Sequence, residues 1–142
     1  MSEFRFFHPV DVRYGDLDPQ GHVNNAKYLT YFEQARMGYW LELGLFSKGQ
    51  SFDEIGVIVA DIHIHYTEPV QWGMSIKAGV CTSRIGNKSL TVEQCLADES
   101  GERIFAAGTV VLVAYDYPAH QSMRVPDLWR ERIERFEGRR LS

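Results

Sequence analysis

The stretch NAKYLTYFEQARMGYWLELG, residues 25–44, decides how this chain folds. Its apolar and aromatic residues recur at every third or fourth position, which is the period of one face of an α-helix. Asn24 or Asn25 is the candidate N-cap, and Gly44 stands where helices commonly end. The pattern predicts one long helix from Asn25 to Leu43 whose broad apolar face must be buried. The residues of that face are Tyr28, Leu29, Phe32, Ala35, Tyr39, Trp40 and Leu43.

Strands are expected on both sides of this helix. Residues 4–14 are rich in aromatic and β-branched residues, and Pro9 favours a sheet edge or a bulge there. After a loop at 48–54, residues 56–66 read GVIVADIHIHY and alternate with the period of two that marks a strand. The alternation predicts an apolar face and a polar face. The apolar face comprises Ile58, Ala60, Ile62, Ile64 and Tyr66, and the polar face comprises Asp61, His63 and His65.

The second half of the chain predicts three more strands and a terminal helix. The turn sequences Gly86-Asn87-Lys88 and ESGE at 99–102 separate the strands, and residues 103–117 form the longest apolar run. Such tight turns imply antiparallel pairing. Residues 126–137 predict a short helix with Pro126 in its first turn. The fold class is therefore α+β, a curled and mainly antiparallel sheet around one long helix, with residues 1–142 as a single domain.

Composition excludes several classes of function. Hydrophobic residues make up 44% and charged residues 24% of the chain, as in ordinary globular proteins. The formal net charge of −4 argues against nucleic-acid binding, and no apolar run is long enough to span a bilayer. With no signal-peptide pattern at the start, the expectation is a cytoplasmic protein without a membrane partner. The two cysteines, Cys81 and Cys95, are expected to be free thiols lying nearly opposite each other across the hairpin.

The most unusual chemistry lies just before the predicted helix. Residues 15–25, GDLDPQGHVNN, contain two aspartates, one histidine and two asparagines. Free N–H groups at a helix N-terminus would polarise a carbonyl docked on the backbone of residues 24–25, and Asp18 upstream could attack it or activate water. With His22, these are the parts needed for acyl transfer or hydrolysis. Loops and caps use the same residue types, so from the residues alone a purely structural loop stays open.

A family resemblance bears on this choice. The segment RYGDLDPQGHVNNAKYLTYFEQAR, residues 13–36, closely resembles the signature of hotdog-fold acyl-CoA thioesterases of the 4-hydroxybenzoyl-CoA thioesterase-like family. Residues 86–93, 111–116 and 124–133 are also similar, so the resemblance covers nearly the whole chain. It implies a hotdog fold and hydrolysis of an acyl thioester to a free acid without a cofactor, with CoA as the expected carrier and acyl carrier protein as the alternative. It also implies a homodimer or homotetramer with its sites at the subunit interface.

The resemblance assigns roles by position. Asp18 matches the catalytic carboxylate, acting as nucleophile or general base, and the Asn25 N–H matches the group that polarises the carbonyl. In plant acyl-ACP thioesterases a histidine at the position of His22 joins the catalytic network, but those enzymes have asparagine in place of Gln20. This departure leaves the detailed roles of Gln20 and His22 open. Asp16 is expected to tie down the loop through backbone hydrogen bonds.

Further residues are candidates for substrate contact. Asn24, Tyr28, Tyr31 and Phe32 belong to the junction and the first helical turns. At the hairpin turn, the resemblance suggests contact with the CoA phosphates of the neighbouring subunit, although an exposed polar turn explains the same residues equally well. The turn residues are Arg84, Asn87, Lys88 and Ser89. On the helix, Glu33 is expected to pair with Arg36 three residues later.

Two other functions stay open at this stage. A hotdog hydratase or dehydratase would carry a G-D-x-N-P-x-H motif, from which this chain departs at Asp18 and His22. A non-catalytic acyl-CoA-binding module would not require a carboxylate at position 18. No metal is expected at Asp61, His63 and His65, because no third histidine has suitable spacing. The length and type of the acyl group are not predicted.

Overall fold

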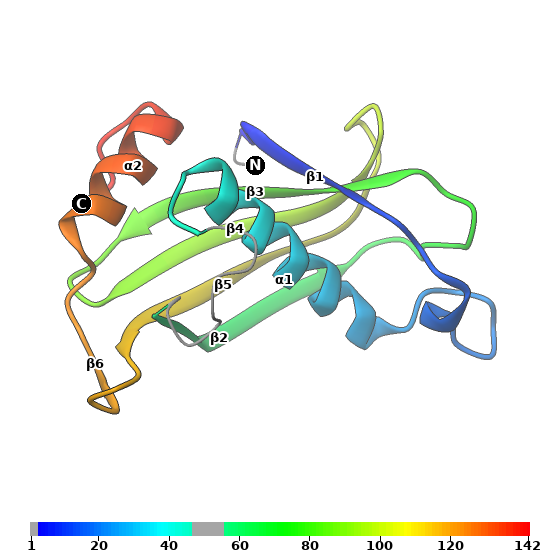
Figure 1. The fold of residues 1–142 in the computed structure, drawn as a ribbon. Helices are drawn as coiled ribbons and strands as arrows, with labels where there is room; N and C mark the ends of the chain where they lie inside the picture. Colours follow the sequence, from blue (N-terminus) through cyan, green and yellow to red (C-terminus); the bar gives the residue numbers. More distant parts are fainter. Residues whose placement is uncertain (1–2, 47–55) are drawn as a thin grey trace.

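A curled sheet with one long helix across it forms the body of the protein (Figure 1). The computed structural model describes residues 3–46 and 56–142, and the loop predicted at 48–54 lies outside them. The predicted α+β hotdog fold is confirmed. In chain order the elements are β1 Phe6–Val10, a 3₁₀ turn Tyr14–Asp16, α1 Asn25–Glu42, β2 Val57–Tyr66, β3 Ile76–Ile85, β4 Ser89–Asp98, β5 Ile104–Asp116, β6 Gln121–Ser122 and α2 Asp127–Glu137.

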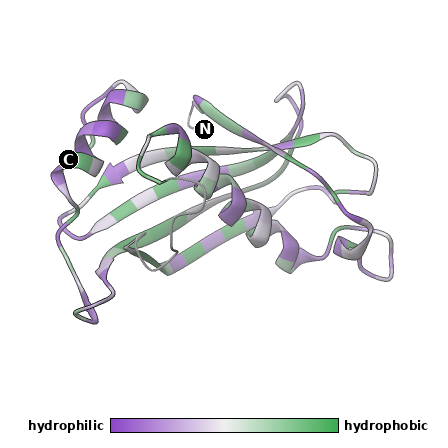
Figure 2. Ribbon diagram, in the orientation of Figure 1, coloured by the Kyte–Doolittle hydropathy of each residue, from purple (hydrophilic) through white to green (hydrophobic). Residues whose placement is uncertain are grey.

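The strands pair antiparallel in the order β1-β3-β4-β5-β2, and the short β6 pairs with the end of β5. Figure 2 shows apolar stretches along the strands, interrupted by polar residues. The turns predicted at 86–88 and 99–102 join β3 to β4 and β4 to β5. Strand β1 is shorter than predicted because only residues 6–10 pair with β3. The strands β1 and β2 are the two edges of this order, which fits the position of Pro9.

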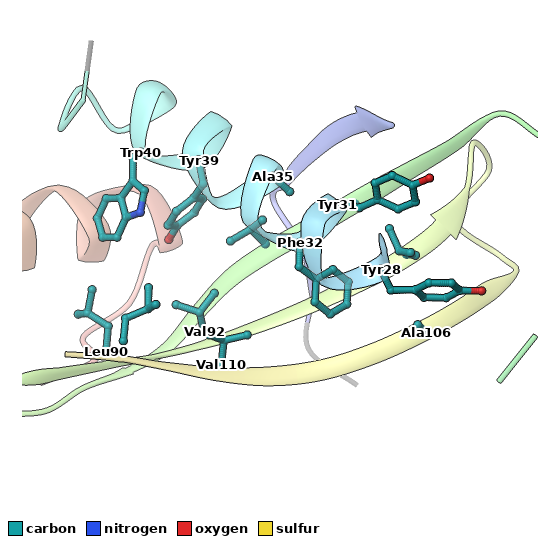
Figure 3. Packing of buried hydrophobic residues seen from close by; sticks show 14 of the residues in the cluster. Tyr28, Tyr31, Phe32, Ala35, Tyr39, Trp40, Leu90, Val92, Ala106 and Val110 are labelled. Atoms are coloured by element: carbon teal, nitrogen blue, oxygen red, sulfur yellow. The ribbon is translucent and has the colours of Figure 1, made fainter. Parts of the chain in front are cut away.

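Helix α1 begins and ends where its capping residues predict. The Asn24 side chain accepts a hydrogen bond from the Ala26 N–H at 2.9 Å. After the helix, Gly44 adopts a φ of 72°, the left-handed conformation that helix C-termini favour. Figure 3 shows the aromatic side chains of α1 directed at the sheet residues Leu90, Val92, Ala106 and Val110. This face of α1 is buried against the sheet and supplies a large part of the hydrophobic core.

Strand β2 departs from strict alternation. Its register with β5 pairs Val59 with Leu112 but Asp61 with Val111, so Ala60 forms a bulge. Leu112 is buried towards α1, and Val59 therefore lies on the helix face, while Ile58 lies opposite Val113 on the outer face. The prediction that Ile58 shares a face with Ile62 and Tyr66 is wrong. One extra residue reverses the faces on its N-terminal side.

Helix α2 closes the end of the sheet near the β3–β4 hairpin (Figure 1). Its last residue, Glu137, is buried and accepts hydrogen bonds from the Tyr39 hydroxyl at 2.5 Å and the Thr82 N–H at 3.1 Å. Cys81 and Cys95 are free and buried as expected. They are not opposite each other, because Cys81 pairs with Glu93 and Cys95 with Gly79. The hairpin turn sets the two cysteines one position out of register, and the register shift between Thr82 and Arg84 adds a second position.

Candidate active site at the start of helix α1

The loop before α1 is built around the carboxylate of Asp18. Asp18 Oδ1 accepts hydrogen bonds from the backbone N–H of Gln20 at 2.9 Å and of His22 at 3.1 Å. The Asp18 N–H donates to the His22 carbonyl at 2.7 Å, which closes a tight loop. Within it Gly21 has a φ of 80°, a conformation that side chains disfavour. Among the described residues Asp18 Oδ2 has no hydrogen-bond partner, so one oxygen is held while the other is available.

The first turn of α1 lies beside this carboxylate. Asn24 caps the Ala26 N–H with its side chain, and its carbonyl accepts from the Lys27 N–H at 2.8 Å. The Asn25 N–H has no acceptor within the described part of the chain, as expected for the first residue of a helix. It therefore combines a free donor with the positive end of the helix dipole.

Asp18, His22, Asn25 and Tyr28 line one open cavity of about 230 Å³, which we call the junction cavity. Its other walls come from residues that the sequence analysis did not select. These are Val23, Tyr66, Thr67, Glu68 and Pro69. Tyr66 was predicted on the apolar face of its strand, and in the structure its hydroxyl donates to the Asn25 carbonyl at 3.1 Å, so it faces α1. The approach of the 67–69 segment had no signal in the sequence, because it depends on how the two loops pack.

Those two loops are held together by main-chain contacts. The Val23 N–H donates to the Val70 carbonyl at 2.8 Å, and His22 forms a bridge with Gln71. The Tyr28 hydroxyl joins the same loop, since it accepts from the Val70 N–H at 3.1 Å and donates to the Glu68 carbonyl. Burial raises the pKa of Tyr28, so its hydroxyl stays protonated. These bonds fix the position of the loop that carries the far wall of the cavity.

Asp16 has the structural surroundings that the sequence analysis expects. It is 2% exposed, and its carboxylate accepts from the Arg13 N–H at 3.0 Å and from the Tyr31 hydroxyl at 2.7 Å. Burial by itself would raise the pKa of Asp16, but these two hydrogen bonds and the nearby charges of Arg13 and Lys27 hold it below its usual value. The Asp16 carbonyl also accepts from the Asn24 N–H, which joins the loop to the start of α1.

The other predicted contact residues lie elsewhere. Tyr31 and Phe32 are buried in the core of α1 and do not line the junction cavity (Figure 3). The turn residues Arg84, Asn87, Lys88 and Ser89 lie at the opposite end of β3. Ten residues of β3 span about 30 Å at roughly 3.3 Å per residue. The turn and the junction cavity of one protomer are therefore too far apart to share a ligand.

His63 and His65 lie side by side on the exposed outer face of β2, with their Nε2 atoms 3.0 Å apart. In the described ranges, no three histidine, cysteine or carboxylate side chains come together to bind a metal ion. No helix within residues 3–46 and 56–142 is long and apolar enough to cross a membrane.

Comparison with known proteins identifies similar chains. The sequence model of the thioesterase-like superfamily matches residues 12–133. YsmA of Bacillus subtilis, an uncharacterised protein, is 32% identical over 79% of this chain and 74% of its own. The long-chain acyl-CoA thioesterase FadM of Escherichia coli is 26% identical over 89% of this chain and 96% of its own. A Thermus thermophilus thioesterase, solved in complex with coenzyme A and Zn, is 35% identical with a TM-score of 0.84, covering 98% of this chain and 99% of that one.

Proposed function

Because the chain belongs to the thioesterase-like superfamily and is a thioester hydrolase, we propose that it cleaves acyl-CoA in the junction cavity, with Asp18 as the reacting carboxylate. The observation that carries this proposal is that Asp18 and Asn25, whose N–H has no acceptor among the described residues, line the same cavity. Acyl-CoA is the substrate named for FadM, and the Thermus relative binds coenzyme A.

The geometry supports different roles for the Asn25 N–H and the Asp18 carboxylate. The thioester carbonyl oxygen docks on the Asn25 N–H, where the helix dipole stabilises the oxyanion that forms during attack. Asp18 Oδ2, which is free of hydrogen bonds to the described residues, reacts from the other side. Either it removes a proton from the attacking water, or it attacks the carbonyl carbon and forms an anhydride that water then hydrolyses. In both routes the C–S bond breaks, and a carboxylic acid and a thiol leave.

We place the functional unit in a dimer formed along β2. This edge strand presents ten residues of backbone, and an unpaired edge of this length readily pairs with another strand. Four large apolar side chains of β2 are exposed, which a partner would cover. They are Ile58, Val59, Ile62 and Tyr66. Since Tyr66 also lines the junction cavity, such a dimer brings a second subunit to the cavity mouth, where its Arg84 to Ser89 turn can hold the CoA phosphates.

Thiol release from acyl-CoAs of graded chain length tests the assignment. Asp18→Asn keeps the shape of the side chain but removes the charge, and we expect kcat to fall about 10²- to 10⁴-fold. Asp11→Asn, on an exposed residue outside the cavity, is the matched control and should retain full activity. Activity of Asp18→Asn close to that of the unmodified protein would refute the role of Asp18. An unmodified protein that hydrolyses none of the acyl-CoAs would refute the proposed substrate class.

A single turnover in ¹⁸O-labelled water tests for attack by Asp18. If Asp18 acts as a general base, or if water attacks the acyl carbonyl of an anhydride, the label enters the released acid in the first turnover. If Asp18 is the nucleophile and water then attacks its carbonyl, the first acid released carries an unlabelled oxygen from Asp18, and the label stays on the protein.

A further inference from the structure

A second cavity lies further along α1, between this helix and the first residues of β2. It has a volume of about 230 Å³, and we call it the Arg36 cavity. Its walls are mostly apolar, and of its two charged residues Arg36 is buried and Glu33 is exposed. The lining residues are Glu33, Arg36, Met37, Trp40, Val57, Val59, Leu112 and Tyr117.

Arg36 has more donors than the protein uses. The residue is 7% exposed, and its Nη1 donates to Gln94 Oε1 at 2.9 Å, the one hydrogen bond of this side chain to the described residues. The predicted pair with Glu33 is absent from the ion pairs of the described residues, none of which includes Arg36. No fully shielded nitrogen or oxygen in the same residues lacks a partner, so the guanidinium nitrogens of Arg36 without a partner keep some accessible surface. Since Arg36 lines the Arg36 cavity, we infer that this surface faces the cavity.

A buried cation without a directly bonded counter-ion is costly, because burial removes the water that would stabilise its charge. Burial lowers the pKa of Arg36, and the charge of the exposed Glu33 acts in the opposite direction without forming an ion pair, so the guanidinium remains protonated. Gln94 is neutral, and its amide is already oriented by a hydrogen bond to the Phe32 carbonyl at 2.9 Å. The group that best completes this site is therefore a carboxylate, which can take two parallel hydrogen bonds from a guanidinium.

The distance between the junction cavity and Arg36 sets the length of the acyl chain that could join them. Asn25 and Arg36 are about three helical turns apart, since 36 − 25 = 11 residues at roughly 3.6 per turn, so they share one face of α1. At about 1.5 Å per residue, Arg36 lies roughly 16 Å further along the axis, a distance that about fourteen carbons span, because C–C bonds near 1.5 Å zigzag in an extended chain. An aliphatic chain that starts at the thioester can therefore end at Arg36.

We propose that the Arg36 cavity binds a carboxylate carried on an aliphatic chain. This deepens the proposed function and rests on it only for the source of the chain. Two sources share the chemistry: the far carboxylate of a dicarboxylic acyl group on CoA, or the free fatty acid that hydrolysis releases. In both cases the apolar walls hold methylene groups while Arg36 pairs with the charge.

Direct binding tests the site independently of hydrolysis. Calorimetry with decanoate and its neutral analogue decanamide should show decanoate binding at least about tenfold more tightly, from charge-assisted hydrogen bonds. Arg36→Met should remove this preference, and Arg135→Met, an exposed arginine on α2, should keep it. Equal affinity for decanoate and decanamide, or a preference that survives Arg36→Met, overturns the proposal.

A second pair of variants covers the case in which Arg36→Met does not fold. Met37 lines the cavity from α1, is partly buried and does not belong to the apolar patch of β2. Met37→Glu supplies a carboxylate from within the chain and should block decanoate, whereas Met37→Gln has nearly the same shape and should not. If both variants bind decanoate equally, the proposal fails.

Rates with dodecanedioyl-CoA and dodecanoyl-CoA identify the source. A higher kcat/KM for dodecanedioyl-CoA that disappears in Arg36→Met assigns the site to dicarboxylic acyl groups. Equal kcat/KM values together with tight decanoate binding assign it to the free acid. A protein that binds decanoate but hydrolyses neither thioester contradicts the proposed function and leaves the carboxylate site standing.

Discussion

Replacing Tyr31 with phenylalanine isolates the hydrogen bond that stabilises the loop before α1. The Tyr31 hydroxyl donates to Asp16 Oδ2 at 2.7 Å, and the two residues are 4% and 2% exposed. Hydrogen bonds to charged groups contribute about 1.5–3 kcal/mol. We expect Tyr31→Phe to lower the free energy of unfolding by about this amount at pH 7. In a chain of this size, that corresponds to a fall in Tm of about 4–12 °C.

The loss should depend on pH in a defined direction. The pKa of Asp16 is lowered in the folded protein, because hydrogen bonds to Tyr31 and Arg13 outweigh the effect of burial. Its contribution is therefore complete above the unfolded pKa, near about 4, and is lost as the pH falls through the lower folded pKa. Tyr31→Phe removes part of that shift, so the stability of the variant should decline less steeply between about pH 4 and pH 2.

Urea denaturation at several pH values measures this effect. Tyr117→Phe is the matched control, because the Tyr117 hydroxyl donates to a neutral acceptor, the Val57 carbonyl, at 2.9 Å. It should cost about 0.5–1.5 kcal/mol at every pH. If Tyr31→Phe costs no more than Tyr117→Phe, or if its cost is the same at pH 3 and pH 7, Asp16 does not act as a buried charged acceptor.

Three further predictions concern other parts of the molecule. Gly108→Ala should lower the free energy of unfolding by about 1–3 kcal/mol, and Tm with it, because a Cβ there would lie 2.5 Å from the His63 carbonyl oxygen. Gly15→Ala is the control in the same melting measurement, since a Cβ there meets nothing within 4 Å. Burial raises the pKa of Cys81 to about 11, so mass spectrometry should find this thiol unmodified by iodoacetamide at pH 8 in the folded protein and modified in urea. Lys88→Ala should raise KM for an acyl-CoA but not for the matching acyl-pantetheine, because the latter lacks the nucleotide phosphates. An equal change in KM for both substrates would argue against phosphate binding at the turn.

Much of the fold follows from local sequence signals. Helix α1 was predicted over 25–43 and spans Asn25–Glu42, because a capping asparagine, an apolar stripe and Gly44 all act within a few residues. The β3–β4 hairpin was equally predictable from its turn. The faces of β2 were not, since the bulge at Ala60 exists only in the pairing with β5. The same limit applies to Cys81 and Cys95, whose relative position depends on a register shift in β3.

The candidate site also has a part that local sequence predicts and a part that depends on tertiary contacts. Asp18, His22 and Asn25 lie within one short segment, and the structure brings them together at the junction cavity. Tyr66 and the 67–69 segment complete its walls through contacts between residues more than 40 positions apart, such as Tyr66 with Asn25. No spacing rule reports such contacts. Arg36 was misjudged for a related reason: helix spacing pointed to Glu33, but the side chain turns inward to Gln94 on β4.

The two aspartates of the loop have opposite surroundings, and this contrast predicts different roles for them. Asp16 is buried and its carboxylate is occupied by Tyr31 and the Arg13 backbone, so it is suited to fixing the chain and has little freedom to react. Asp18 is only half-buried, and the backbone holds one of its oxygens. Because the Asp16 carbonyl also holds the Asn24 N–H, a displacement of Asp16 moves the helix start and Asp18 together. Asp16→Asn should therefore lower kcat through misplacement, with a smaller loss than Asp18→Asn and with the pH dependence of the rate unchanged.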